Sequence, residues 1–446
     1  MFPLTRPIRQ VSATVALVVL TVAPTIYVTM TAWRIGRPEH RREVETEIGR
    51  ILGLQVTLDA VRYPRPGEVE YHGVVFRQEE PRGKGLMELA RASVVRLRRG
   101  DRELMLEAGG LTIRADSPRA AMAQVGVLLQ RSGDSTYERV SLSAPDCLLD
   151  LGAGVPSYRL REVVGQFVAD RSAPTVRASY RVVADPKGTG PGTRCELTLT
   201  RDRKAEPVRT SLTLKTMEGL PLPARVLDPF FDAVDWLGPD ARADGVLSLR
   251  QEGSNEWEVD FQGNLHDIDL AELVNRRFPS HRLRGKARLA IHSARWAERP
   301  GQGFGWVEAT GELTAGPGMI GYGLLQALKT EMRFRPSQRV VRAVSAGQVD
   351  LDFRALAFTF AMTSNGEIKV GGAMGNEFDP DVILVSANDP LAYAPQGAAN
   401  VRGLIKTLVP VTAINRAAMV PLTERSRILL SLPVPPDTVH KRIKGN

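Results

Sequence analysis

The feature that most constrains this chain is a long series of short segments in which apolar and polar residues alternate. The clearest one is 256–262, where Trp257, Val259 and Phe261 are separated by acidic residues. Period-two alternation is typical of a strand that turns one face to a core and the other to water. Similar segments recur from residue 54 onward, with Gly and Pro between them. The sequence therefore predicts a mainly β protein of short strands joined by turns.

The alternation changes phase within residues 349–362, where apolar residues occupy odd positions as far as Phe353 and even positions from Leu356. Such a slip predicts a bulge or a turn. Two interpretations of the apolar face stay open: the closed core of an ordinary β-sandwich, or one face of a curved sheet that holds acyl chains. In the second, the candidate groove face consists of Trp257, Val259, Phe261, Leu351, Phe353, Phe358 and Phe360.

Helical periodicity interrupts the strands at a few places. Residues 38–52 and 222–238 each place apolar residues on one stripe. Ser117 and Pro118 open another predicted helix at about 117–132, and a shorter helix is expected at about 323–330. From residue 244, a unit of two strands joined by a long hairpin and followed by a short apolar helix recurs loosely. Repetition of one β unit predicts an elongated, curved antiparallel sheet that grows by addition.

These patterns divide the chain into five regions. We expect an N-terminal membrane anchor with basic flanks (1–37), a helix and β region (38–116), a middle β region with helices (117–240), a region of loose β repeats (241–397) and a basic, partly helical tail (398–446).

The proposed anchor is residues 11–33, which carry no charge and run from Val11 through Leu20 and Tyr27 to Trp33. This length spans a hydrocarbon layer of about 30 Å, and Tyr and Trp suit its interfacial end. A cleaved signal peptide is the alternative, but its apolar region is usually about 7–15 residues long. The sequence therefore favours an uncleaved, single-pass anchor.

The positive charge lies at the two ends of the chain. Residues 1–50 carry a net charge of +3 and residues 401–446 a net charge of +6, which together equal the +9 of the whole chain. A neutral body argues against a protein that tracks nucleic-acid phosphates, whereas basic ends suit anionic lipid headgroups. The arginines after the anchor favour a cytoplasmic body, but long domains often cross the membrane despite such a bias.

No motif for a catalytic or cofactor site is convincing. The six histidines show no metal-ligand spacing, and His266, Asp267 and Asp269 fit a solvated turn that caps a helix better than a metal site. We therefore expect no enzyme activity, no metal and no cofactor. The two cysteines, Cys147 and Cys195, are either a disulfide or two buried thiols.

One G-x-G-x-x-G, formed by Gly316, Gly318 and Gly321, invites a dinucleotide-binding interpretation. The preceding strand alternates like a half-exposed strand, and the helix after it is too short for a crossover between parallel strands. No acid follows at about 20 residues. The stretch therefore reads as a Gly-rich hairpin exit that leads into a small apolar helix, and a dinucleotide enzyme is a distant third hypothesis.

Several segments together resemble the AsmA-like family of bacterial envelope proteins (the AsmA and TamB type). The resemblance rests on the anchor, on "EVETEIGRILGLQVTLDAVRYPRPGEVEYHGVVF" at 43–76 and "LMELARASVVRLR" at 86–98, and on "ATGELTAGPGMIGYGLLQAL" and "GEIKVGGAMG" towards the other end. Residues 120–240 match no segment of the family. The resemblance implies an inner-membrane anchor, a periplasmic body and a groove-forming sheet linked to lipid traffic or outer-membrane assembly.

The leading hypothesis is accordingly a non-catalytic envelope protein that handles lipids along an apolar β groove or assists outer-membrane assembly. Its expected partners are cytoplasmic-membrane lipids, lipid cargo and other envelope proteins, with no nucleic acid. The alternative is a β-rich scaffold of the cell envelope that transports nothing. A continuous open apolar face would favour the first hypothesis, and closed sandwiches the second.

Overall fold

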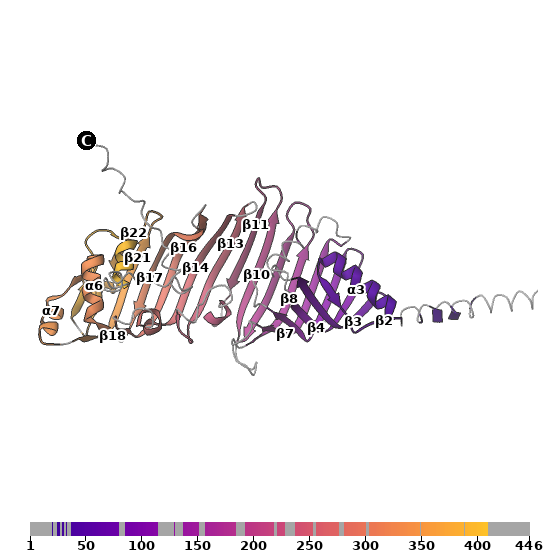
Figure 1. Cartoon of the computed structure of the whole chain (residues 1–446), viewed down its shortest axis with the longest axis horizontal. Coiled ribbons are helices and arrows are strands. Elements are labelled where there is room, and N and C mark those ends of the chain that lie inside the picture. Colours follow the sequence, from indigo (N-terminus) through magenta and orange to yellow (C-terminus); the bar gives the residue numbers. More distant parts are fainter. Residues whose placement is uncertain are drawn as a thin grey trace, which may run out of the picture.

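The computed structural model is an elongated, curved β-sheet with helices at its two ends (Figure 1). The structure describes residues 20, 25–26, 29–30, 33, 37–79, 85–114, 129, 137–150, 157–183, 192–217, 221–227, 237–252, 256–275, 281–299, 303–347, 349–387 and 389–408. The prediction of a mainly β chain with a few short helices is confirmed.

Most of the strands belong to the large sheet, and three short ones form a second sheet. The strands are β1 (Gln55–Thr57), β2 (Ala60–Arg65), β3 (Glu68–Glu79), β4 (Leu86–Arg99), β5 (Glu103–Gly109), β6 (Leu111–Arg114), β7 (Arg139–Asp150), β8 (Tyr158–Val168), β9 (Thr175–Val183), β10 (Thr193–Asp202), β11 (Arg209–Thr216), β12 (Leu222–Pro223), β13 (Arg242–Glu252), β14 (Glu256–Asp269), β15 (Leu283–Arg284), β16 (Lys286–Arg299), β17 (Gly303–Ala315), β18 (Gly318–Gly321), β19 (Arg335–Pro336), β20 (Asp350–Phe353), β21 (Ala355–Met362), β22 (Glu367–Gly372), β23 (Val382–Val385), β24 (Pro390–Tyr393) and β25 (Ala399–Asn400). The helices are α3 (Pro38–Leu52), α6 (Tyr322–Met332), α7 (Gln338–Ser345) and α8 (Val401–Leu408), with helical turns η3 (Ala224–Leu227), η4 (Ala271–Asn275) and η5 (Gly375–Glu377).

The large sheet follows the chain from one end of the molecule to the other. Each long strand from β3 to β22 pairs with the one before it and the one after it. The expectation of a purely antiparallel sheet is wrong at one place, because β5 and β6 pair in parallel with β7. A parallel pair needs a crossover connection of a dozen or more residues, and residues 115–138 provide that length.

One line of irregularity crosses the N-terminal half of the sheet. In each of β3, β4, β5 with β6, β7 and β8, two residues three positions apart pack into the same hydrophobic cluster, although strict alternation would put them on opposite faces. The pairs are Tyr71 and Val74, Val95 and Ala92, Ala108 and Leu111, Ala144 and Cys147, and Leu160 and Val163. These breaks in the alternation lie side by side on neighbouring strands. They include Gly73, Gly110 and Glu162, whose φ angles are 60°, 62° and 54°. Extra residues of this kind bend a strand, so the sheet is creased along this line while its apolar side chains stay on one face.

We expect the crease to be sensitive to Gly110→Ala. Gly110 has a left-handed backbone, and an added Cβ would lie 2.3 Å from Ser93 Oγ. The substitution should lower the free energy of unfolding by about 2–3 kcal/mol, measured by chemical denaturation. Gly67→Ala is the matched control, since Gly67 also has a positive φ (78°) but an added Cβ meets nothing within 4 Å. Gly67→Ala should lower the free energy of unfolding by only about 1 kcal/mol. Equal losses in the two variants would contradict the close approach at the crease.

Helix α3 has the predicted bounds, 38–52. Pro38 occupies its first turn, where no intrahelical N–H is needed, and Gly53 ends it in the left-handed conformation with its N–H on Gly49 O. The predicted helix at 323–330 is α6, which begins one residue earlier and ends two residues later. The prediction at 222–238 is wrong for its first residues, because Leu222 and Pro223 pair with β13 instead.

Two predicted helical segments lie largely outside the described residues. Residue 129 is the only described position of 117–132, and the tail is described only as far as α8. Among the described residues, no helix is both long enough and apolar enough to cross a membrane. The proposed anchor falls mostly outside the described part, including Val11 and Tyr27. Its described residues Leu20 and Trp33 are exposed, and the Arg37 guanidinium lies 3.5 Å from the Trp33 ring centroid.

Candidate functional site

The register of the central strands places apolar side chains on one face of the large sheet. Leu247 stands opposite Phe261 and Leu249 opposite Val259 in the β13–β14 pair. On the other side of β13, Leu249 stands opposite Leu212 of β11. Residues directly opposite one another in a ladder share a face. We call this face of the sheet the apolar face.

The apolar face continues in both directions along the sheet. Towards the C-terminus, Phe261 stands opposite Ala294, Ala294 opposite Ala309, and Gly311 opposite both Ile291 and Phe360. Towards the N-terminus, the succession from β11 is Leu212, Leu199, Val176, Phe167, Val140 and Leu104. With neighbouring strands about 4.8 Å apart, the stretch from β4 to β22 runs for about 60 Å.

The middle of the apolar face is only half-buried. A central group of its side chains is neither fully buried nor part of any hydrophobic cluster formed by the described residues. We call this group the open stripe: Leu212, Leu247, Leu249, Val259, Phe261, Ile291 and Phe360. A second sheet packed on it would bury these residues, as the core of a β-sandwich does. The open stripe is therefore an extended, partly exposed apolar surface, and we take it as the candidate site.

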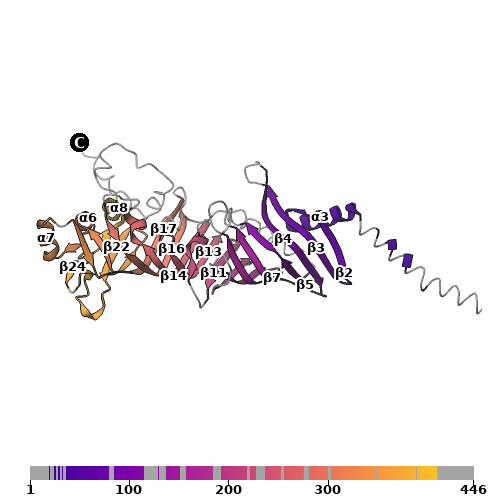
Figure 2. The ribbon, with the colours of Figure 1, turned by 90° about the horizontal axis from the view of Figure 1, so that it is seen from below.

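Buried cores cover the apolar face at its two ends, and another core, which includes Cys147, Cys195 and Leu214, covers part of it between β5 and β11. At the N-terminal end, Val44 and Ile48 of α3 pack with Val74 and Ala92. At the C-terminal end, α6 and α8 pack on Ile368 and Met362, and the small sheet packs nearby on Phe358. Figure 2 shows α3 at one end of the sheet and α6 with α8 at the other. Among the described residues, no helix belongs to a hydrophobic cluster with the side chains of the open stripe.

The opposite face of the sheet is charged, and we call it the charged face. Arg250 lies 3.9 Å from Glu258 and 3.6 Å from Asp260, and Arg295 also pairs with Glu258. Farther along, Arg96 lies 2.8 Å from Glu70. Because the arginines of these pairs are about half exposed, each pair stabilises the fold little, by up to about 1 kcal/mol. These ion pairs instead make the face hydrophilic, so that it stays solvated.

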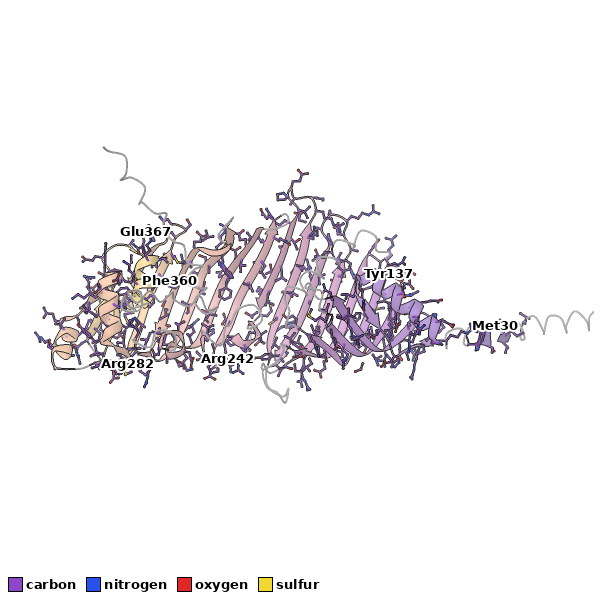
Figure 3. The ribbon with its side chains drawn as sticks, in the orientation of Figure 1. Met30, Tyr137, Arg242, Arg282, Phe360 and Glu367 are labelled. Atoms are coloured by element: carbon purple, nitrogen blue, oxygen red, sulfur yellow. The ribbon has the colours of Figure 1, made fainter. Side chains whose placement is uncertain are left out.

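The structure brings together most of the predicted groove residues. Val259, Phe261, Phe358 and Phe360 lie on the apolar face, and Figure 3 shows Phe360 near its C-terminal end. Trp257 occupies the expected position of β14, opposite Gln251. Phe358 also packs against the C-terminal core, so it borders the open stripe.

Two of the predicted groove residues are elsewhere. Leu351 and Phe353 belong to β20 of the small sheet, and they are only 7% and 2% exposed within the C-terminal core. The change of phase in the alternation reflects a change of sheet. The chain leaves the small sheet after Phe353 and enters the large sheet at Ala355. The prediction that a turn or bulge falls there is confirmed, but the placement of Leu351 and Phe353 on the open face is wrong.

The glycines of the G-x-G-x-x-G stand where other parts of the chain approach the backbone. A Cβ on Gly316 would lie 2.2 Å from Arg354 O, and one on Gly318 would lie 2.1 Å from Arg284 O and 2.5 Å from the Phe353 ring. Strand β18, which runs from Gly318 to Gly321, is antiparallel to both of its neighbours, β15 and β20. These glycines therefore serve close packing between the small sheet and the chain around it, and α6 follows as a core helix.

The polar residues near η4 have structural partners. Asp269 accepts hydrogen bonds from the N–H groups of Ala271 and Glu272, so the predicted capping is confirmed for this residue. His266 and Asp267 lie within β14 and not in a turn. His266 lies 2.5 Å from Asp244. Burial alone would raise the pKa of Asp244, but hydrogen bonds from Asn264 and His266 outweigh it and lower that pKa. Within the described part of the chain, no cluster of three or more His, Cys, Asp or Glu side chains could hold a metal ion.

The two cysteines are free and buried on the apolar face. Cys147 of β7 and Cys195 of β10 are separated by β8 and β9, which puts them about 14 Å apart, beyond the reach of a disulfide. Burial raises the pKa of Cys147 to about 12 and that of Cys195 to about 11. The structure thus selects two buried thiols from the two alternatives.

We expect both thiols to be unreactive in the folded protein. Because the thiolate is the reactive form, raised pKa values keep the reaction with a disulfide reagent slow between pH 7 and pH 9. Titration of the native chain should consume almost no reagent, and denaturation without reductant should release two equivalents. A denatured, unreduced chain that shows no thiol would contradict the structure.

Comparison with models of known families, with curated proteins and with solved structures found no match. Sequence reasoning singled out Val259 and Phe261 but missed their partners Leu212, Leu247 and Leu249. The signal for these was present in the alternation of "VLSLRQ" at 246–251, but only the register reveals that the strands share one surface.

Proposed function

We propose that this protein is a non-catalytic, membrane-anchored envelope protein that holds lipid acyl chains on the apolar face and guides them along it as in a groove. The observation that carries this proposal is the open stripe, an apolar surface that continues from strand to strand and has a charged surface on its reverse side. Assistance to outer-membrane assembly would use the same surface.

Acyl chains suit the open stripe on energetic grounds. Each CH₂ group that leaves water for an apolar surface gains about 0.8 kcal/mol. The open stripe crosses the strands from β11 to β21, a distance of about 24 Å, which exceeds the 15 Å or so of one monolayer's hydrocarbon. Between Leu212 and Phe360 the stripe has no charged side chain that would fix a chain in one place. A bound chain would therefore be held by contact area and could move from one strand to the next.

The proposed location rests on the sequence. The uncharged residues 11–33 precede α3, which covers the N-terminal end of the apolar face, so an anchor there would bring this end close to a membrane. The resemblance to AsmA-like proteins implies that the membrane is the cytoplasmic one and that the body is periplasmic. We propose this arrangement for the chain, with membrane lipids as its source of acyl chains.

Native mass spectrometry of the full chain, released gently from detergent, tests this function. We expect copurifying phospholipid, and faster transfer of a labelled phospholipid between liposomes when the protein is added. A chain that carries no lipid and transfers none would overturn the proposal. That outcome would favour the alternative, an envelope scaffold in which the apolar face binds another protein.

A further inference from the structure

A cavity that is wide open to solvent lies at the C-terminal tip of the molecule, away from the open stripe. It is formed by α7, β19 and β24, at the end of the sheet opposite α3 (Figure 1). Its volume is about 910 Å³, within the usual range for small-molecule sites. The lining that matters here is polar: Arg335, Ser337, Arg339, Arg342, Asp389 and Tyr393.

Three guanidinium groups line this cavity, and two are held in place. Arg335 lies 2.8 Å from Asp381, donates to Ala394 O at 3.2 Å and stands 5.5 Å from the Tyr393 ring centroid. Arg339 pairs with Asp389. Arg342 forms no ion pair with any residue that the structure describes. The cavity thus has three positive groups against the one carboxylate, Asp389, in its lining.

Ser337 adds a hydroxyl that lacks a partner. Its backbone N–H donates to Leu391 O at 2.9 Å, which fixes the residue between β19 and α7. Its Oγ is buried and makes no hydrogen bond within the described part of the chain. A buried polar atom without a partner costs about 1–3 kcal/mol. Gln78 and Ser386 have such atoms too, so Ser337 Oγ by itself identifies no ligand.

We propose that this cavity binds a phosphate group, with Arg342 and Arg339 as its main ligands. Guanidinium groups match phosphate oxygens with two parallel hydrogen bonds, and a tetrahedral anion has enough oxygens for several donors at once. Asp389 is the internal competitor, because its carboxylate already occupies Arg339. The inference is independent of acyl chains on the apolar face, so failure of either leaves the other standing.

The phosphate has two possible sources, a lipid headgroup or free phosphate, which share this chemistry. Calorimetric titration of the full chain in nonionic detergent with glycerophosphoglycerol, a deacylated phosphodiester headgroup, and separately with inorganic phosphate distinguishes them. Tighter binding of the diester assigns the cavity to a lipid headgroup, and tighter binding of inorganic phosphate assigns it to the free anion. Binding of neither compound at millimolar concentration overturns the proposal.

Two substitutions with opposite expected effects sharpen the test. Arg342→Gln should weaken binding at least fivefold, whereas Asp389→Asn, which releases Arg339 from its competitor, should strengthen it at least threefold. Arg209→Gln is the matched control, since Arg209 is a similarly exposed arginine that pairs with Glu252 far from the cavity. It should leave the affinity unchanged. Binding that survives Arg342→Gln intact and does not improve in Asp389→Asn contradicts the site, and circular dichroism of each variant confirms that it is folded.

Discussion

Replacement of Leu247 and Phe261 together with Glu is expected to abolish phospholipid transfer while leaving the protein folded. The two residues face each other across the β13–β14 pair, in the middle of the open stripe. Two carboxylates there would deprive an acyl chain of contact for about four CH₂ groups, or about 3 kcal/mol, which is roughly a hundredfold in affinity. Transfer of a labelled phospholipid between liposomes measures the loss.

The control introduces the same charge on the other face of the same two strands. Ser248→Glu with Gln262→Glu alters the neighbouring residues, whose side chains lie on the charged face. Transfer should remain near that of the unmodified protein. If both double variants lose transfer equally, net charge rather than the apolar face explains the effect. If the Leu247 and Phe261 variant unfolds, the stripe is a covered core and the open face is wrong.

The second large effect is on the free energy of unfolding, and it concerns Phe353 and Phe261. The sequence placed both on one groove face, and the structure separates them. Phe353→Ala should lower the free energy of unfolding by about 3–5 kcal/mol, because Phe353 is 2% exposed in the C-terminal core and its removal leaves a cavity. Phe261→Ala should cost less than about 1.5 kcal/mol, because its side chain is half-buried on the open stripe and solvent fills the space. Chemical denaturation measures both values.

This comparison also separates stability from lipid handling. Phe261→Ala should reduce phospholipid transfer while changing stability little, and Phe353→Ala should do the reverse at temperatures where it remains folded. Equal destabilisation by the two substitutions would mean that both phenylalanines belong to closed cores. The open face would then have to be abandoned for this part of the sheet.

The alternation of apolar residues was enough to predict strands and a two-faced sheet. In 256–262 every second residue is acidic or, at Gln262, polar, and this alternation is typical of a half-exposed strand. Helix α3 was equally predictable, because its apolar residues form one stripe and because Pro38 and Gly53 mark its two ends. Both inferences depend only on neighbours in the sequence.

The features that were missed depend on contacts between distant parts of the chain. Leu351 and Phe353 alternate as Phe358 and Phe360 do, and alternation does not tell which sheet a strand joins. The crease needs shifts at Gly73, in β4 and at Gly110 that only the register aligns. Leu222 and Pro223 have helical spacing with their successors, but hydrogen bonds to β13 determine their conformation.

Site-specific photocrosslinking in living cells tests the central claim most directly. A photoreactive amino acid at Val259 points from the apolar face, and one at the adjacent Glu258 points from the charged face of the same strand. With cells grown on radiolabelled phosphate, the open stripe predicts phospholipid crosslinked at position 259 and none at position 258. Label at both positions or at neither would contradict the proposal that acyl chains lie on the apolar face.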